Sequence, residues 1–339
     1  DHVDKSGRPL AEQFAQRVAY VAAADRLGFY AYHVAEHHAT PLNMVPVPGV
    51  FLGAVAQATT NIRLGPLTYL LPLYSPLRLI EEVGMFDHLS NGRMEIGVGR
   101  GVSPFELNYH NFDPDTARAV YGEALEVLIE GMTHEKLSYE GKHFNYTDVP
   151  MELRPLQDPH PPLWYPSSNP EGSKYAGENG FHYCTLGAVE MAKANIAAFS
   201  EAYAKRGGAV GAQRPFPGGA AIGISRQVTV GETNEEALKI AGPAYKVWHD
   251  SLTKLWRENN VEGPHFARNT VDTVEKAIAG GVHIAGSPET VREQLAEQID
   301  ALGVNYLVMA FNIGDMAHED ALRSITLFGE EVMPKLADL

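Results

Sequence analysis

Residues 62–99 read IRLGPLTYLLPLYSPLRLIEEVGMFDHLSNGRMEIGVG. The first part of this stretch, 62–72, is apolar and predicts an extended segment. Pro76 then occupies the favoured first position of a helix, which runs to about Leu89. The Asn91-Gly92 pair turns the chain into a second strand at 93–99. A strand, a helix and a strand in this order predict a βαβ unit with parallel strands.

The same alternation continues on both sides of this stretch. Seven strands are predicted, each followed by helix, at 29–34, 62–72, 93–99, 163–165, 182–184, 220–230 and 305–311. This rhythm predicts an α/β fold of the TIM (β/α)8 barrel type, and because such a barrel has eight strands, we expect its first strand upstream of residue 1. A doubly wound open sheet is the alternative, but it would carry its glycine-rich phosphate loop after the first strand.

The alternation has no linker, so residues 1–339 are predicted to form a single domain. The segment 133–161 interrupts the rhythm and is predicted to be a hairpin insertion with Gly141 in its turn. A helix is predicted over 234–257, whereas the segment 258–285 has weak periodicity and is rich in Gly, His and Asn.

Composition excludes several classes of function. Lys and Arg number 27 against 42 Asp and Glu, and the net charge of −15 disfavours nucleic acid as a partner. A single cysteine, Cys184, excludes disulfides within the chain and thiolate metal sites, and it fits a reducing, cytoplasmic location. We find neither a signal peptide nor an apolar run long enough for a membrane helix.

Glu36, His37 and His38 follow the first predicted strand, at the barrel end where loops form active sites. A metal site is disfavoured because adjacent residues of an extended chain point to opposite faces. A hydrogen-bonded loop with a structural histidine is one reading. The other, which we favour, is a catalytic histidine beside a carboxylate.

Two later strand ends carry features of an anion site. A dinucleotide fingerprint needs a third glycine, which is absent from the segment Gly97-Val98-Gly99-Arg100-Gly101. We therefore expect Arg100 to bind a phosphate, or else to pair with a barrel carboxylate. After 163–165 come hydroxyl and amide side chains at a helix start, which suit an anion but also ordinary helix capping. These residues are Ser167, Ser168, Asn169, Gly172 and Ser173. In a barrel both strand ends lie at the same mouth, which favours a bound phosphate.

Several of these motifs, in this order and spacing, resemble the bacterial luciferase-like flavin monooxygenases. The resemblance rests on residues 36–38, Pro72, 76–78, 86–93, 97–101, 286–291, 318–324 and 331–334. The family fold is a TIM barrel, in agreement with the alternation. The resemblance therefore implies a non-covalently bound FMN at the carboxyl-terminal mouth of the barrel.

The resemblance also assigns individual residues. His37 matches the catalytic histidine, flanked by Glu36 and His38, and Arg100 matches the residue that meets the FMN phosphate. Glu81 matches a carboxylate beneath the flavin. Two groups of residues complete the cofactor site: Ser167, Ser168, Asn169, Gly172 and Ser173 on the phosphate side, and Leu67-Thr68 where the family holds a cis peptide under the ring. At this last place the chain departs from the family, since Leu67, Thr68 and Tyr69 replace small residues.

The implied reaction begins with reduced FMN supplied by a separate flavin reductase. Reduced FMN and O2 give a flavin 4a-hydroperoxide, which oxygenates a small organic substrate such as an aldehyde or ketone. His37 is expected to act as acid/base on the flavin–oxygen adduct, which must be shielded from water. The segment 258–285 occupies the place of a mobile lid, and family members are commonly homodimers.

Three alternatives remain at this stage. A deazaflavin-dependent hydride-transfer enzyme of the same superfamily would share the barrel and the anion site. A non-catalytic flavin-binding protein would not need an intact His37 and Arg100. A metal-dependent barrel hydrolase would need a third ligand beside His37 and His38, and the sequence offers no obvious one.

Overall fold

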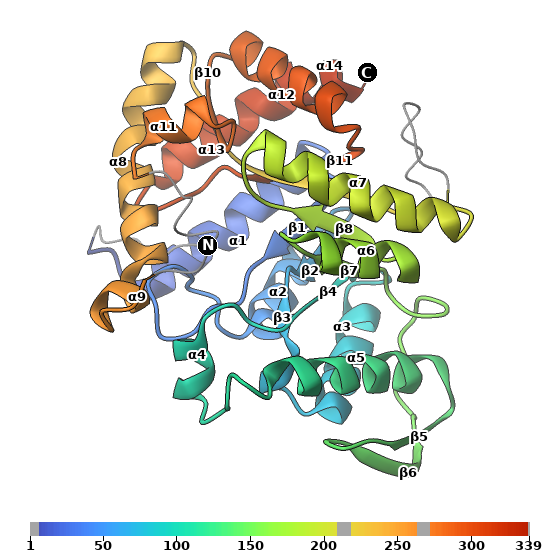
Figure 1. The fold of residues 1–339 in the computed structure, drawn as a ribbon. Coiled ribbons are helices and arrows are strands. Elements are labelled where there is room, and N and C mark those ends of the chain that lie inside the picture. The colour runs from blue at the N-terminus through green and yellow to red at the C-terminus, as the bar shows by residue number, and fades with distance from the viewer. Residues whose placement is uncertain (1–6, 209–217, 263–271, 338–339) are drawn as a thin grey trace. The chain divides into compact units, whose positions relative to one another are not determined.

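The computed structural model describes residues 7–208, 218–262 and 272–337 (Figure 1). The chain divides into two units, which we describe separately. The first unit comprises residues 1–29, 40–44 and 165–339, and the second unit comprises residues 30–39 and 45–164.

The second unit is built on parallel strands in sequential order. They are β1 (Ala31–Val34), β2 (Arg63–Pro66), β3 (Tyr69–Leu70), β4 (Ile96–Gly99) and the first two residues of β7 (Leu163–Pro166). β1 pairs with β2, a bridge joins Leu64 to Met94, β3 pairs with β4, and Ile96 pairs with Leu163. β2 and β3 both lie between β1 and β4 in this order, so the strands follow one another along the sheet as they do along the chain, as in a β/α barrel.

Helices follow these strands where local signals predict them. They are α2 (Pro48–Ala58), the 3-10 turn η1 (Leu71–Leu73), α3 (Pro76–Leu89), α4 (Pro104–Tyr109) and α5 (Ala117–Thr133). α3 begins with Pro76 and packs Leu79, Ile80 and Val83 into the interior. The insertion is confirmed as an antiparallel hairpin of β5 (Lys136–Glu140) and β6 (Asn145–Pro150).

A buried polar cluster lies near the amino ends of β2 and β4. The carboxylate of Glu95 is fully buried and accepts hydrogen bonds of 2.6 Å from Arg63 Nε and of 2.6 Å from Trp164 Nε1. Arg63 also donates to two backbone carbonyls, so the charge pair is well satisfied. A charge pair at this end of a barrel is structural, because catalysis takes place at the opposite end.

The first unit contains four further strands that pair in parallel. They are β8 (His182–Thr185), β9 (Ile222–Val230), β10 (His283–Gly286) and β11 (Tyr306–Ala310). β9 is central, since it pairs with β8, with β11 along 223–227 and with β10 along 227–230. The seven predicted strands are all present, with β2 and β3 sharing one predicted segment, and β10 is additional.

The helices of the first unit pack around these strands. They are α1 (Leu10–Arg26), α6 (Pro170–Asn179), α7 (Val189–Lys205), α8 (Asn234–Leu252), α9 (Lys254–Glu258), α11 (Val274–Ala279), α12 (Pro288–Leu302), α13 (His318–Leu327), the π-helical turn η2 (Phe328–Val332) and α14 (Met333–Ala337). α6 and α7 lie side by side (Figure 1), and Tyr183, Phe199 and Ile224 form part of the apolar core with them.

One prediction about helices is corrected here. The single helix predicted over 234–257 is interrupted at Thr253, where α8 ends and α9 begins. The segment predicted as a lid, 258–285, contains α11 and the strand β10, which is bonded to β9. Residues 263–271 of that segment lie outside the described residues. No helix in the described parts of the chain has the length and apolar character needed to cross a bilayer.

Candidate active site

Glu36 anchors the loop that follows β1. Its buried carboxylate accepts a hydrogen bond of 3.1 Å from the backbone N–H of Leu70 and one of 2.9 Å from the Tyr74 hydroxyl. The other oxygen lies 2.8 Å from Nε2 of His38. Glu36 therefore joins the β1 loop to β3, to the residue that follows η1 and to His38.

His37 is paired with a carboxylate that the sequence did not single out. Nδ1 of His37 lies 3.2 Å from Oε1 of Glu106, and Oε2 of Glu106 accepts a 2.8 Å hydrogen bond from the backbone N–H of His38. An ionised carboxylate can only accept, so Nδ1 carries the proton and Nε2 is left with a lone pair. The His37 side chain keeps 23% of its surface exposed.

Glu106 reaches this place because of α4. α4 begins at Pro104, with Ser103 as a capping residue that accepts from the N–H of Glu106. Ser-x-x-Glu ahead of a helix is a recognised N-terminal signature, and Ser103 to Glu106 matches it. That signal predicts the helix, although the Glu106 side chain turns to His37 rather than back to its own cap.

Two tyrosine hydroxyls border the histidine loop. Burial, with Glu36 next to it, raises the pKa of Tyr74, and burial with Glu82 next to it raises the pKa of Tyr69 well above its ordinary value. Both hydroxyls therefore stay protonated and donate to their carboxylates. The two rings meet edge to face with centroids 5.3 Å apart, which fixes their orientation.

The Leu67–Thr68 peptide bond is cis, as the resemblance led us to expect. Both side chains are half-buried. The glycines of β4 lie against this bond, because a Cβ at Gly97 would overlap the backbone carbonyl of Pro66 and a Cβ at Gly99 would overlap the Thr68 hydroxyl. Gly99 thus allows close packing against Thr68, a reason the sequence alone did not supply.

The acidic pair of α3 is divided between solvent and interior. Glu81, the carboxylate predicted beneath the flavin, is exposed. Its neighbour Glu82 is half-buried and accepts a 2.8 Å hydrogen bond from the Tyr69 hydroxyl. The Glu82 carboxylate also packs against Gly49, where a Cβ would overlap it. The carboxylate that faces the cis-peptide segment is therefore Glu82.

Arg100 follows β4 and is exposed. Within residues 7–208, 218–262 and 272–337, its side chain has no hydrogen bond or ion pair. The alternative of a structural pair with a barrel carboxylate is thus not found among these residues. An exposed guanidinium of this kind suits a ligand anion.

The segment predicted on the phosphate side forms the start of α6. Asn169 caps the helix by accepting from the N–H of Gly172 at 2.9 Å, and the buried Ser173 hydroxyl donates to the Asn169 carbonyl at 2.7 Å. Ser167 also donates to that carbonyl, at 3.1 Å. Ser168 is half-buried, and no described residue partners its hydroxyl. Asn169 and Ser173 are thus engaged in capping, which leaves Ser168 as the hydroxyl available to an anion.

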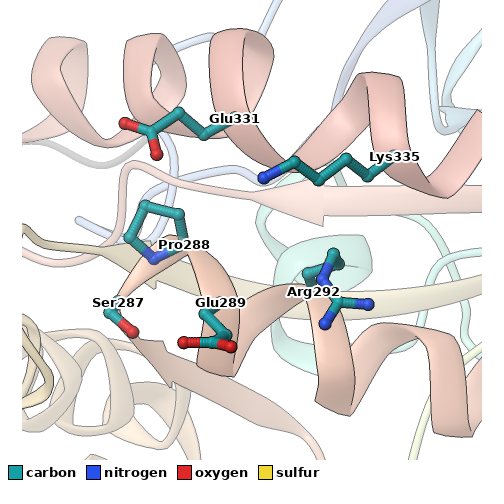
Figure 2. Close-up of a pocket in the computed structure, with 6 residues that line it drawn as sticks. All are labelled: Ser287, Pro288, Glu289, Arg292, Glu331 and Lys335. Atoms are coloured by element: carbon teal, nitrogen blue, oxygen red, sulfur yellow. The ribbon is translucent and has the colours of Figure 1, made fainter.

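Two further observations concern metal ligands and a surface pocket. No group of three His, Cys, Asp or Glu side chains able to hold a metal ion occurs among the described residues. A surface pocket at the start of α12 brings acidic and basic side chains together (Figure 2) and is lined by Ser287, Pro288, Glu289, Arg292, Glu331 and Lys335. None of the predicted site residues lines this pocket.

A family model described as luciferase-like monooxygenase matches residues 2–306. The chain belongs to this family. This chain is 38% identical over 336 residues to the uncharacterized protein y4wF of Sinorhizobium fredii. The alignment covers 99% of this chain and 96% of that one. The luciferase-like monooxygenase is 27% identical to limonene 1,2-monooxygenase of Rhodococcus erythropolis, over 94% and 80% of the two chains. The oxygenase component of the flavin-dependent trigonelline monooxygenase of Acinetobacter baylyi is 33% identical over 46% of this chain and 44% of its own.

Solved structures agree on the fold of this luciferase-like monooxygenase. Monooxygenase RslO1 from Streptomyces bottropensis has a TM-score of 0.86 at 22% identity, over 98% of this chain and 96% of that one. The oxygenating constituent of 3,6-diketocamphane monooxygenase from Pseudomonas putida, solved with FMN, has a TM-score of 0.79 at 22% identity, over 98% and 96%. The coenzyme F420 dependent tetrahydromethanopterin reductase of Methanopyrus kandleri has a TM-score of 0.71 at 18% identity, over 95% and 96%. The prediction of a luciferase-like fold of the TIM-barrel type is therefore confirmed.

Proposed function

We propose that this luciferase-like monooxygenase uses reduced FMN and O2 to oxygenate a small organic substrate of the aldehyde or ketone class. The observation that carries the proposal is the His37–Glu106 pair, with a 3.2 Å contact between Nδ1 and Oε1. It supplies a partly exposed imidazole, held by a carboxylate, at the end of a strand where barrel enzymes perform chemistry.

Each residue of the β1 loop has a separate role in this proposal. His37 binds the reacting group through Nε2 and moves a proton there. Glu106 holds the imidazole in one tautomer and one orientation, because its two oxygens contact both His37 and the backbone of His38. Glu36 and His38 position the loop and are not required to touch the substrate.

The residues present fit FMN. When bound, reduced FMN would supply the electrons that activate O2. In the second unit, Arg100, which has no partner among the described residues, suits the phosphate of such a cofactor. In the first unit, Ser168 and the amino-terminal N–H groups of α6 are a separate feature that suits an anion. Leu67 and Thr68 would contact the ring, and the Tyr69–Glu82 hydrogen bond holds the residue that follows them in place.

Two protein partners belong to the proposal. A separate flavin reductase would supply reduced FMN, as the name "oxygenase component" of the trigonelline relative suggests. A second copy of this chain would cover the exposed apolar side chains of α2 and α3, of which Val50 is 76%, Met85 54% and Leu89 57% exposed. Sedimentation analysis of the wild type and of Met85→Glu tests the dimer, which we expect the substitution to dissociate.

A deazaflavin-dependent hydride transfer is the second candidate, favoured by the likeness to the Methanopyrus kandleri F420 reductase fold. The His37–Glu106 pair would then protonate a carbonyl oxygen, and O2 would have no part in the reaction. The two candidates differ in cofactor and in oxidant, so both are open to direct measurement.

Titration of the purified protein with FMN, reduced FMN and F420 separates the candidates. The proposal expects binding of reduced FMN, O2 consumption with a reductase, and substrate-coupled turnover on an aldehyde and ketone panel. His37→Ala should lose that turnover while still binding FMN, and Arg100→Ala should weaken FMN binding. Tight F420 binding without any binding of FMN would overturn the proposal in favour of hydride transfer.

A further inference from the structure

Two asparagines flank β11, and they differ in how their carboxamides are used. Asn305 precedes the strand, and its side chain accepts from the N–H of Ile222 at 2.7 Å and donates to the carbonyl of Ala220 at 3.3 Å. Asn312 follows the strand. Its Oδ1 and Nδ2 are both buried, and neither has a partner within residues 7–208, 218–262 and 272–337.

An amide whose donor and acceptor are both buried is unusual. Nearly all buried polar groups in folded proteins have a hydrogen-bond partner, because leaving one unpaired costs its lost hydration. Asn312 is surrounded in sequence by apolar side chains that are themselves buried, namely Phe311, Ile313 and Met316. This carboxamide therefore needs a partner from outside the described protein.

Asn312 stands where a ligand would supply that partner. It lies just beyond the carboxyl end of β11, the strand end at which TIM-barrel enzymes bind their ligands. The loop continues against α8, since a Cβ at Gly314 would overlap the carbonyl of Ala244. Ser251 lies two helical turns after Ala244 on the same face of α8, and its buried hydroxyl also has no partner in the described part of the chain.

We propose that the Asn312 carboxamide binds a ligand edge of the amide or imide type, through both of its hydrogen-bonding atoms. Such an edge offers an N–H beside a carbonyl, so it satisfies Oδ1 and Nδ2 together, whereas a ketone satisfies Nδ2 alone. Two ligands carry this chemistry, and they are the pyrimidine ring of a bound flavin and an amide- or lactam-bearing substrate. The flavin source rests on the proposed function, and the substrate source does not.

The first arm of the test uses the protein without ligand. Asn312→Leu removes an unpaired amide, so the melting temperature should stay the same or rise. Asn305→Leu is the matched control. It should lower the melting temperature because the N–H of Ile222 and the carbonyl of Ala220 each lose a hydrogen-bond partner. Equal losses of stability in the two variants would mean that Asn312 is a structural residue, and would overturn the proposal.

The second arm uses ε-caprolactam and cycloheptanone, which share a ring size and differ in the amide. The wild type should bind the lactam about tenfold more tightly, since it gains one further hydrogen bond. Asn312→Leu should remove that preference without weakening ketone binding. Repeating the titration with saturating FMN distinguishes the sources, because a flavin that occupies Asn312 will compete with the lactam.

The third arm measures the dissociation constant of FMN by flavin fluorescence. If the flavin is the source, Asn312→Leu should weaken FMN binding about tenfold. If neither the lactam preference nor FMN binding changes in Asn312→Leu, the proposal is wrong. A wild type that fails to bind FMN refutes the proposed function, and the lactam arm then decides the role of Asn312 alone.

Discussion

Replacing Glu106 with glutamine perturbs the pair on which the proposed chemistry depends. The carboxylate lies 3.2 Å from His37 Nδ1 through one oxygen and accepts the His38 N–H at 2.8 Å through the other. Glutamine has a single oxygen, so it keeps one of these contacts and loses the negative charge. A hydrogen bond to a charged group contributes about 1.5–3 kcal/mol, which corresponds to a loss of roughly 10- to 150-fold in kcat.

The assay is a single-turnover reaction in which reduced FMN, O2 and a substrate of the aldehyde and ketone panel are mixed with enzyme. Product per turnover should fall in Glu106→Gln, whereas binding of FMN should not change. Glu81→Gln is the matched control, since Glu81 is exposed and has no described contact with the histidine loop. The reasoning is refuted if Glu106→Gln keeps wild-type kcat, or if Glu81→Gln loses as much.

Three further predictions address packing, pH and the acidic pair of α3. Gly97→Ala should cost about 1–3 kcal/mol of unfolding free energy because its Cβ would overlap neighbouring backbone, whereas Gly53→Ala, in open space on α2, should be neutral or stabilising; urea unfolding measures both. Burial lowers the pKa of His283 from 6.5 to about 4, so between these pH values the unfolded chain binds a proton that the folded chain does not. About 3 kcal/mol of unfolding free energy should therefore be lost as the pH falls from 6.5 to 4. His283→Gln should flatten that part of the profile of melting temperature against pH. Glu82→Gln should weaken FMN binding more than Glu81→Gln, which fluorescence titration measures, and an equal effect would contradict the inward placement of Glu82.

Local signals predicted the parts of the fold that depend on neighbouring residues. The helix predicted from Pro76 to about Leu89 matches α3, because a proline at the first position and an Asn-Gly turn after the end both act within a few residues. The position of Glu36, His37 and His38 at the end of a strand followed from the same alternation.

Contacts between distant residues could not be predicted in this way. Glu106 is 69 residues from His37, and only the packing of α4 brings the two together. Glu81 and Glu82 differ by one position on a helix, and a periodic pattern does not fix which of the two faces Tyr69. β10 is only four residues long and buried on all sides, so it lacks the alternation that identifies a half-exposed strand.

The fate of dioxygen distinguishes an oxygenase from a hydride-transfer enzyme. Enzyme loaded with reduced FMN is mixed with 18O2 and a substrate of the aldehyde and ketone panel, and the product is analysed by mass spectrometry. We expect one oxygen atom from 18O2 to enter each product molecule, and His37→Ala to abolish this incorporation while still binding FMN. A product without 18O, formed equally well in the absence of oxygen, would contradict this expectation.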